Sequence, residues 1–218
     1  MNRIVVPYGK RSNITLADGS KVWLNSGTQL DFPTTFTGST REINVNGEIY
    51  IEVEENKDIP FIVNTNNMSI KVYGTSFNVT AYEEDDINRV VLVNGSVGLS
   101  VLGQKNEVIL KPSEKADLIA TDIIKETVNT SEYISWINDV LEFNETPISE
   151  ILKRVGRYYN VQFENMPEIS LNKQTCSGKL FLSNNLDSVM TAISSISSTE
   201  YTRNNNIIQI NKNEEPMN

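Results

Sequence analysis

The N-terminal half of the chain is typified by the stretch REINVNGEIYIEV, residues 41–53. Apolar and polar side chains alternate on both sides of Asn46-Gly47, which is the pattern of β-strands with one buried face. Asn-Gly between two alternating runs is a strong β-hairpin signal, because both turn residues must adopt a positive φ. The stretch therefore predicts two antiparallel strands joined at Asn46-Gly47.

Further turn signals extend this pattern along the chain. Asp18-Gly19 separates the alternating runs 14–16 and 22–24, and Asn94-Gly95 separates 91–93 from 97–101. Apolar strand segments also occupy 60–64, 69–73 and 76–82. Short strands with turn signals roughly every 8–12 residues are typical of all-β folds. We expect a mainly β protein with an all-β antiparallel sandwich or roll over residues 1–122.

The pattern changes in the second half of the chain. Residues 123–135 are polar and weakly periodic, and we expect a linker there. Residues 136–212 repeat one pattern, so that Phe143 corresponds to Phe181 and Phe163 to Tyr201. In both copies apolar residues recur at helical spacing, at 148, 151, 152 and 155 and at 186, 189, 190 and 193. The second half therefore predicts a small α+β domain of duplicated β-α-β units, followed by a frayed tail over 213–218.

The start of each predicted helix carries a candidate capping residue. Thr146 and Asn184 have side-chain oxygens that can accept from the free N–H groups of a first helical turn. Pro147 fits the first helical position, where its missing N–H costs nothing. Helices are accordingly expected to begin directly after Thr146 and Asn184.

Composition excludes several classes of site. The chain has 218 residues, no histidine, one cysteine and a net charge of −9. Without histidine there is no Ser-His-Asp triad and no histidine metal site, and a single cysteine, Cys176, excludes a multi-cysteine zinc site. The acidic balance disfavours nonspecific nucleic-acid binding. We expect no catalytic residue, no cofactor and no bound metal.

One dipeptide has the residues needed for self-cleavage of the backbone. Gly74-Thr75 lies in an apparent strand region, 72–77, and a Thr hydroxyl can attack a strained preceding carbonyl so that the peptide rearranges to an ester and hydrolyses. The alternative is a glycine bulge that bends the strand, and this alternative is favoured. We therefore predict an intact Gly74–Thr75 bond, with self-cleavage as the minor alternative.

Several motifs occur in a fixed order along the chain. They are PYGK at 7–10, LADGSKVWLNS at 16–26, RE at 41–42, GEIYIEV at 47–53, PFIV at 60–63, YGTSFNV at 73–79, Trp136 and LEF at 141–143. Together they resemble the FecR-type anti-sigma factors of the Bacteroidetes kind, and the second half is similar to the short domain at the N-termini of secretins and TonB-dependent transducers. The resemblance covers nearly the whole chain.

The resemblance implies a signalling role without turnover. Such proteins receive a signal in the periplasm from a TonB-dependent outer-membrane receptor and relay it to an extracytoplasmic-function sigma factor. It also implies an upstream cytoplasmic region that holds the sigma factor and an inner-membrane helix, both missing from this chain. Some members of the family cut themselves at a Gly-Thr bond, which corresponds to Gly74-Thr75.

Two other readings stay open. A carbohydrate-binding or adhesive β-domain would use exposed aromatic residues on one sheet face, with Trp23, Tyr50 and Tyr73 as candidates. A hydrolase that uses only carboxylates would need two acids in one cleft, roughly 5–10 Å apart. We favour the signalling module over both.

The partner surface is expected in the second half of the chain. A small sheet with helices on one face leaves strand edges whose unpaired N–H and C=O groups invite strand addition by a partner. The resemblance identifies that partner as the signalling domain of the outer-membrane receptor. The candidate residues lie on the predicted strands and beside them: Leu141, Phe143, Tyr158, Val161, Phe163, Leu180 and Leu182.

Overall fold

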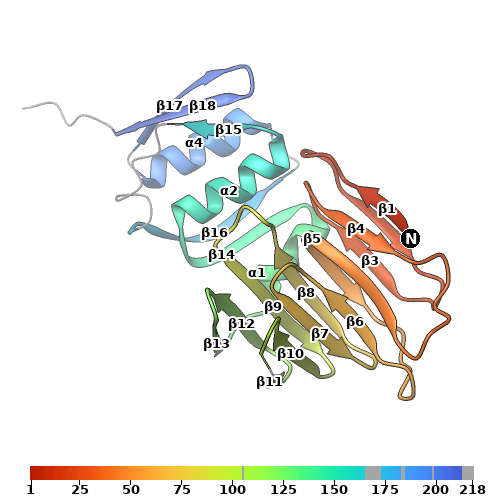
Figure 1. Cartoon of the computed structure of the whole chain (residues 1–218). Coiled ribbons are helices and arrows are strands. Elements are labelled where there is room, and N and C mark those ends of the chain that lie inside the picture. The colour runs from red at the N-terminus through yellow and green to blue at the C-terminus, as the bar shows by residue number, and fades with distance from the viewer. Residues whose placement is uncertain (105, 165–172, 183–184, 198, 213–218) are drawn as a thin grey trace, which may run out of the picture. The chain divides into compact units, whose positions relative to one another are not determined.

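The computed structural model describes residues 1–104, 106–164, 173–182, 185–197 and 199–212. The chain divides into two compact units, Met1–Ile134 and Ser135–Asn218. The first unit is built of strands, with one short helix at its end, and the second of strands and helices (Figure 1). The predicted fold class, a mainly β protein with a small α+β region at its C-terminal end, is confirmed.

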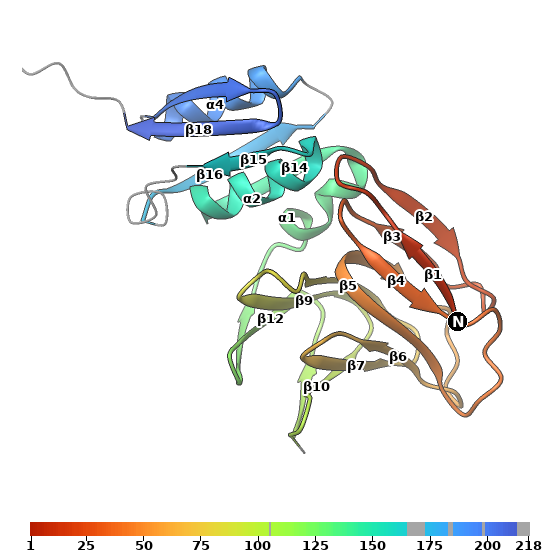
Figure 2. The same ribbon diagram turned by 45° about the horizontal axis from the view of Figure 1, so that its top comes forward.

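The N-terminal unit is a curled sheet made of two halves that share one long strand, β5 (Figure 2). We call the halves sheet A and sheet B. Sheet A has the order β1 (Asn2–Val5), β4 (Gln29–Phe32), β5 (Arg41–Glu52), β6 (Phe61–Asn64), β7 (Met68–Val72), β10 (Val97–Val101) and β11 (Glu107–Leu110). Sheet B has the order β2 (Ser12–Thr15), β3 (Lys21–Leu24), β5, β8 (Ser76–Ala81), β9 (Ile87–Asn94), β12 (Glu114–Ile119) and β13 (Asp122–Thr127). All of these pairs are antiparallel except β5–β6, which is parallel.

The predicted hairpin at Asn46-Gly47 is wrong, because residues 41–52 form a single strand. The first half of β5 pairs in sheet A, and the second half, from Gly47, pairs in sheet B. Gly47 has φ +132°, and a Cβ there would lie 2.6 Å from the Thr28 Cα. The Thr28 hydroxyl donates to the Glu48 carbonyl and accepts from the Glu48 N–H, both at 3.0 Å. Asn-Gly therefore bends a strand from one sheet into the other.

The second predicted Asn-Gly hairpin is also wrong. Strands β9 and β10 flank Asn94-Gly95, but β9 pairs with β8 and β12 while β10 pairs with β7 and β11. The dipeptide thus carries the chain from sheet B to sheet A. The Asp18-Gly19 hairpin is confirmed, because β2 pairs with β3 around a turn in which the Leu16 N–H donates to the Ser20 carbonyl at 2.8 Å.

One hydrophobic core lies between the two sheets, formed by alternate side chains of each strand. Its bulky, fully buried members include Leu24, Leu30, Phe61, Phe77 and Leu92. Burying each such side chain contributes about 1.5–3 kcal/mol. The alternation that predicted the strands is therefore also what positions this core.

A buried ion pair ties three loops to the start of β5. Arg41 is 3% exposed, and its Nη1 lies 2.8 Å from the Asp18 carboxylate and 2.8 Å from the Glu54 carbonyl oxygen. Its Nε and Nη2 donate to the Ile59 carbonyl at 3.2 and 3.0 Å. Removing a buried charge that has this many partners strongly destabilises a fold, because the groups that remain lose their partner in the interior.

The expected linker is not a linker along its whole length. Residues 122–127, which overlap the predicted 123–135 segment, form β13 and pair with β12 along their full length. Residues Ser131–Ile134 form the short helix α1, still in the N-terminal unit. The polar sequence suggested a linker, but it is polar because β13 is an edge strand with most of its side chains exposed.

The C-terminal unit begins with a turn of 3-10 helix, η1 (Ser135–Asn138), and contains two small sheets and two described helices. Strands β14 (Val140–Pro147) and β16 (Thr175–Phe181) pair antiparallel. Strands β15 (Gln162–Glu164), β18 (Ile207–Lys212) and β17 (Thr199–Asn204) form the second sheet, in which β15 and β18 are parallel. The helices are α2 (Ile148–Tyr159) and α4 (Leu186–Ser197). The predicted tail, 213–218, lies outside the described residues.

The two helices bury the faces that the repeat predicts. Ile148, Ile151, Leu152 and Val155 of α2 are buried, as are their counterparts Leu186, Val189, Met190 and Ile193 of α4. This correspondence makes the two helices equivalent parts of the repeat.

The predicted cap of the first helix is wrong. Thr146 belongs to β14, where its hydroxyl donates to the Asn144 carbonyl, and Pro147 takes the cap position without a side-chain hydrogen bond. Asn184 lies outside the described residues. Its neighbour Asn185 accepts from the Ser188 N–H at 2.9 Å and so caps α4.

Candidate functional site

The seven predicted partner-binding residues lie in the C-terminal unit, where most of them contribute to packing. Leu141, Phe143, Val161 and Leu182 are buried, while Tyr158, Phe163 and Leu180 are half-buried. A buried side chain cannot contact a partner while the unit stays folded. The prediction that these strands bind a partner therefore rests on their backbone edges and on neighbouring exposed side chains.

Two of the aromatic residues pack over glycines of the same unit. A Cβ at Gly156 of α2 would lie 3.4 Å from the Phe163 ring and 3.0 Å from the Val161 carbonyl. A Cβ at Gly178 of β16 would lie 3.7 Å from the Phe143 ring. Gly156 therefore allows the Phe163 ring and the Val161 carbonyl to approach α2 closely, whereas a Cβ at Gly178 would make only an ordinary van der Waals contact with Phe143; both rings pack within the unit.

Tyr158 is held within the unit by its neighbours. Its ring lies edge-on to that of Tyr159, with centroids 4.8 Å apart, and its hydroxyl lies 3.4 Å from the Asp139 carboxylate. The Tyr159 hydroxyl donates to the Leu182 carbonyl at 3.0 Å. Burial, and secondly the neighbouring Tyr158, raises the pKa of Tyr159 to about 12. The pair joins the end of α2 to the end of β16.

The strand edges are the most available part of this unit. In the described part of the chain, β14 and β16 pair only with each other, and β15 and β17 pair only with β18. On β16, Phe181 is 56% exposed and Lys179 is also exposed. Sequence reasoning missed Phe181 although it aligned this residue with the buried Phe143. The alternation along 180–182 could have identified it, since Leu180 and Leu182 share the opposite face.

Gly74-Thr75 lies between β7 and β8, not inside a strand as expected. Thr75 is buried, and its hydroxyl donates to the Ser96 carbonyl at 3.0 Å. The Thr75 carbonyl accepts from the Val53 N–H at 3.0 Å, and a register shift marks a bulge at Ser76–Phe77, directly afterwards. Cβ atoms at Gly74 and Gly95 would fall 2.8 Å from the Glu55 Cα and 2.8 Å from the Thr75 hydroxyl. The dipeptide fits a tightly packed crossing between the sheets.

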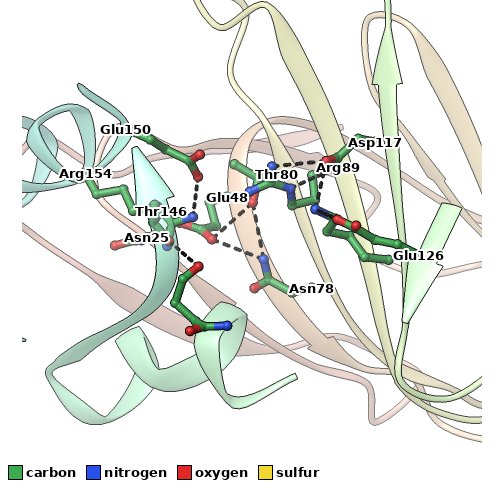
Figure 3. A network of polar contacts seen from close by, with 12 residues as sticks. Asn25, Glu48, Asn78, Thr80, Arg89, Asp117, Glu126, Thr146, Glu150 and Arg154 are labelled. Carbon is green, nitrogen blue, oxygen red and sulfur yellow. Dashed lines mark hydrogen bonds and ion pairs between the residues drawn. The ribbon is translucent and has the colours of Figure 1, made fainter. Parts of the chain in front are cut away.

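A carboxylate network lies on the outer face of sheet B (Figure 3). One Glu48 oxygen accepts from Asn78 and Thr80, both at 3.1 Å, and the other accepts from Asn25 at 2.7 Å. These bonds join β5 to β8 and to Asn25, which directly follows β3. Because all three donors are neutral and point at one carboxylate, the network holds these strands in register and is not an acid–base pair.

A second network surrounds Asp117 (Figure 3). The Nε and Nη2 atoms of Arg89 donate to the Asp117 carboxylate at 2.6 and 3.2 Å. The Lys115 Nζ lies 3.0 Å from the same carboxylate and also pairs with Glu126. Burial lowers the pKa of Lys115, but the hydrogen bonds to Glu126 and Asp117 outweigh burial and raise it overall. Arg89 and Lys115 also lie over the Tyr133 ring, at 5.4 and 5.8 Å from its centroid. The cluster anchors α1 on β9 and β12.

The three aromatic residues considered for sugar binding do not all lie on one sheet face. Trp23 and Tyr50 form a cross-strand pair on sheet B, with centroids 5.4 Å apart, and Tyr50 is buried. Tyr73 follows β7 of sheet A, where Lys71 lies 5.6 Å from its ring centroid. These three residues therefore form no common stacking platform.

Metal and membrane features can be stated for the described ranges. There, no group of three or more His, Cys, Asp or Glu side chains is arranged to hold a metal ion. Cys176 is half-buried in β16, with its sulfur 3.7 Å from the Ser177 carbonyl. None of the helices in those ranges has the length and apolar character needed to cross a bilayer.

Comparison with known proteins identifies both units. The family model for FecR protein matches residues 2–98, and the model for the FecR C-terminal region matches residues 140–210. No curated protein gives a significant match.

Solved structures give the same answer over nearly the full length. A crystal structure at 1.65 Å of a protein proposed to be an anti-sigma factor, from Parabacteroides distasonis ATCC 8503, is 29% identical with a TM-score of 0.89. The match covers 98% of this chain and 100% of that one. A second crystal structure with the same description, at 2.50 Å, gives a TM-score of 0.88 at 29% identity and covers 98% and 99% of the two chains. Two family regions in order, one on each structural unit, and a full-length structural match together show that the chain belongs to the FecR-type anti-sigma factors.

Proposed function

We propose that this chain is the periplasmic signal-receiving region of a membrane-anchored anti-sigma factor. In this role it takes a signal from a TonB-dependent outer-membrane receptor and passes it to an extracytoplasmic-function sigma factor held by a cytoplasmic region. The chain acts by binding and has no turnover of its own. Its anchor is an inner-membrane helix upstream of the residues described here.

The observation that carries the proposal is the placement of the two family regions. The FecR region falls within the N-terminal unit and the FecR C-terminal region within the C-terminal unit. Family membership supports the anti-sigma role, and the absence of a metal-holding cluster among the described residues is compatible with a binding protein. The receptor and the sigma factor follow from the resemblance and are the parts to be tested.

The C-terminal unit supplies the docking surface in this proposal. Strands β14 and β16 form a two-stranded sheet, and strands of small sheets pair readily with a strand from a partner. Lys179 and the exposed Phe181 lie on β16, so that a partner strand would gain backbone hydrogen bonds and one aromatic contact. Exposed aromatic residues are the side chains that contribute most at protein interfaces.

The test is a titration of the full 218-residue chain with the N-terminal signalling domain of a TonB-dependent receptor encoded beside its gene. Phe181→Asp places a charge at the proposed contact and should weaken binding at least ~10-fold, as for an interface aromatic. Ile196→Asp is the matched control, because Ile196 is 54% exposed and lies on α4. It should bind as the unmodified chain does.

Two results would contradict parts of the proposal. Full affinity in Phe181→Asp, with the fold intact, would exclude β16 as the docking strand. No binding of any receptor signalling domain from the same genome would remove the receptor from the proposal, although family membership would stand.

A further inference from the structure

Sheet A carries polar side chains in register across its outer face. The pairing of β4, β5, β6 and β7 places Asp31 opposite Asn44, Asn44 opposite Asn64 and Asn64 opposite Ser69. Gln29 lies opposite Asn46 in the adjacent row. Side chains at these positions point to the same side of a sheet, away from the core formed by their strand neighbours.

Most of these residues line a pocket of about 260 Å³. Five of the lining residues carry side-chain amides and one a carboxylate; the full lining is Gln29, Asp31, Asn44, Val45, Asn46, Asn64, Thr65 and Asn66. The pocket lies below the range of ~300–1,000 Å³ found for sites of drug-sized ligands. A single small unit of a ligand is therefore what it accommodates.

Three of the lining side chains are held in place by bonds within the N-terminal unit. Arg3 binds the Asp31 carboxylate with two nitrogens, at 2.6 and 2.7 Å. Asn46 accepts from the Glu83 N–H at 3.1 Å, and Asn64 accepts from the Ser69 hydroxyl at 3.0 Å. The Asn64 oxygen is thus engaged, which leaves its NH₂ group available to donate.

Other amides keep their full bonding capacity. In the described part of the chain, the side chains of Gln29, Asn44 and Asn66 form no hydrogen bond. Each carries two N–H donors and one carbonyl acceptor. Asn44 and Asn66 are exposed and Gln29 is half-buried, so these amides are accessible to a polar ligand beside the side chains that are held in place.

The chemistry of the lining selects the ligand class. Asp31 is already neutralised by Arg3, so neither an anion nor a cation finds a free opposite charge in this lining. The lining side chains include no aromatic residue, which disfavours nucleobases and apolar ligands. Groups that both donate and accept fit best, and sugar hydroxyls do both. A peptide would add to a strand edge, whereas this pocket lies on a sheet face.

We propose that this pocket binds a neutral sugar unit of an oligosaccharide, through the amides of Gln29, Asn44 and Asn64. The site lies in the N-terminal unit and does not depend on the proposed receptor contact. It would give the FecR region a ligand of its own, besides the protein partner of the C-terminal unit.

The experiment is side-chain amide NMR on the ¹⁵N-labelled full chain. Maltotriose and tri-N-acetylchitotriose are the probes, each added at millimolar concentration, and trialanine is added separately as a peptide probe. The NH₂ signals of Gln29, Asn44 and Asn64 should shift with at least one sugar and should not shift with trialanine. The double variant Gln29→Ala with Asn44→Ala should bind the sugar about 25-fold more weakly, since each neutral hydrogen bond contributes about five-fold.

Asn13→Ala is the matched control, because Asn13 is an exposed strand amide on β2 of sheet B. It should leave sugar binding unchanged. The absence of shifts with both sugars overturns the proposal, as does unchanged affinity in the double variant with its backbone spectrum intact. Shifts with trialanine but not with the sugars overturn the assigned ligand class.

Discussion

The two units of this chain use their strands in opposite ways. In the N-terminal unit, β5 runs through both sheets, and a single core lies between them. Two of its edge strands contact each other, because Lys125 of β13 donates to the Ile109 carbonyl of β11 at 3.2 Å, while the edge strands β1 and β2 each pair with one neighbour among the described residues. The C-terminal unit instead divides its described strands between sheets of two and three strands.

This difference motivates the proposed division of roles between the units. A lysine bonded to the carbonyl of an edge strand hinders strand addition at that position, and charged residues on edge strands are one way in which sheets avoid association. In the proposal above, the small sheets of the C-terminal unit bind a partner strand through their edges, and the following predictions test the contrast between the two units.

Two tryptophans make unit-specific measurements practical. The chain has two, Trp23 in the N-terminal unit and Trp136 in the C-terminal unit. Fluorescence of a Trp136→Phe background reports the first unit, and fluorescence of a Trp23→Phe background reports the second. Denaturant unfolding followed in both backgrounds then separates the stability of the two units.

The largest effect is expected from Arg41→Ala. It removes one partner of a buried pair, so that Asp18 loses its counter-charge and the Ile59 and Glu54 carbonyls lose their side-chain donor, which should cost the N-terminal unit about 3–5 kcal/mol. Trp23 fluorescence should report the loss, while Trp136 fluorescence stays unchanged.

The matched control for this prediction is Arg3→Ala. Arg3 binds Asp31 with the same two-nitrogen geometry but on the surface, with its side chain 61% exposed, and should have no measurable effect. Equal losses of unfolding free energy in the two variants would show that burial does not make the Arg41 ion pair more stabilising than the Arg3 ion pair. A parallel loss at Trp136 would show that the units unfold as one.

Gly47→Ala should have the next largest effect, about 3 kcal/mol on the same unit. The new Cβ would meet the backbone of Thr28 at 2.6 Å in addition to the strain of φ +132°. Gly103→Ala is the control, because Gly103 has φ +82° but open space around it, and should cost only about 1 kcal/mol. If both substitutions cost the same, the close approach of β5 to Thr28 is not what requires a glycine there.

These glycines also show how far sequence could predict the fold. Alternation predicted the strands, their buried faces and the fold class, since period-two burial is a local property of each strand. It could not predict which strands pair. At Asn46-Gly47 and Asn94-Gly95 only the glycine has a positive φ, whereas a type I′ hairpin turn needs it at both residues, and both dipeptides move the chain between sheets. The deciding contacts, Thr28 against Gly47 and Thr75 against Gly95, are distant in sequence.

The candidate site was predictable to a similar degree. The resemblance placed the partner surface in the second half, and strand positions there were close to those observed. The chosen residues were selected for being apolar, and apolar residues on strands are more often core, as Leu141 and Phe143 are. The amides around Asn44 gave no signal at all, because only strand register brings Gln29, Asn44 and Asn64 together.

Thr75→Ala tests the Gly74–Thr75 bond at a smaller energetic cost. The variant loses the hydrogen bond to the Ser96 carbonyl and should destabilise the N-terminal unit by about 1 kcal/mol. We expect the unmodified chain and the variant to run as one band at 24.5 kDa on a denaturing gel. Two smaller bands from the unmodified chain, absent in Thr75→Ala, would instead establish self-cleavage through the hydroxyl.

The smallest effect concerns the C-terminal unit at alkaline pH. Because burial raises the pKa of Tyr159 from 10.0 to about 12, the phenol ionises first in the unfolded chain. The stability that the neutral Tyr159 phenol gives the C-terminal unit is fully present below pH 10 and is lost as pH rises from 10 toward 12. Tyr159→Phe should cost about 1 kcal/mol at neutral pH, through the bond to Leu182, and should flatten the alkaline loss.

Trp136 fluorescence in the Trp23→Phe background measures this loss between pH 10 and about 12, the window set by the unfolded and folded pKa values. Tyr201→Phe is the control, since it removes a phenol bonded to the Asp187 carbonyl in the same unit and leaves Tyr159 in place. It should keep the alkaline loss of the unmodified chain. If Tyr159→Phe keeps that loss as well, the contact between the ends of α2 and β16 does not set the pH response. The alkaline sensitivity would then arise elsewhere in the unit, and the contact would have only a packing role.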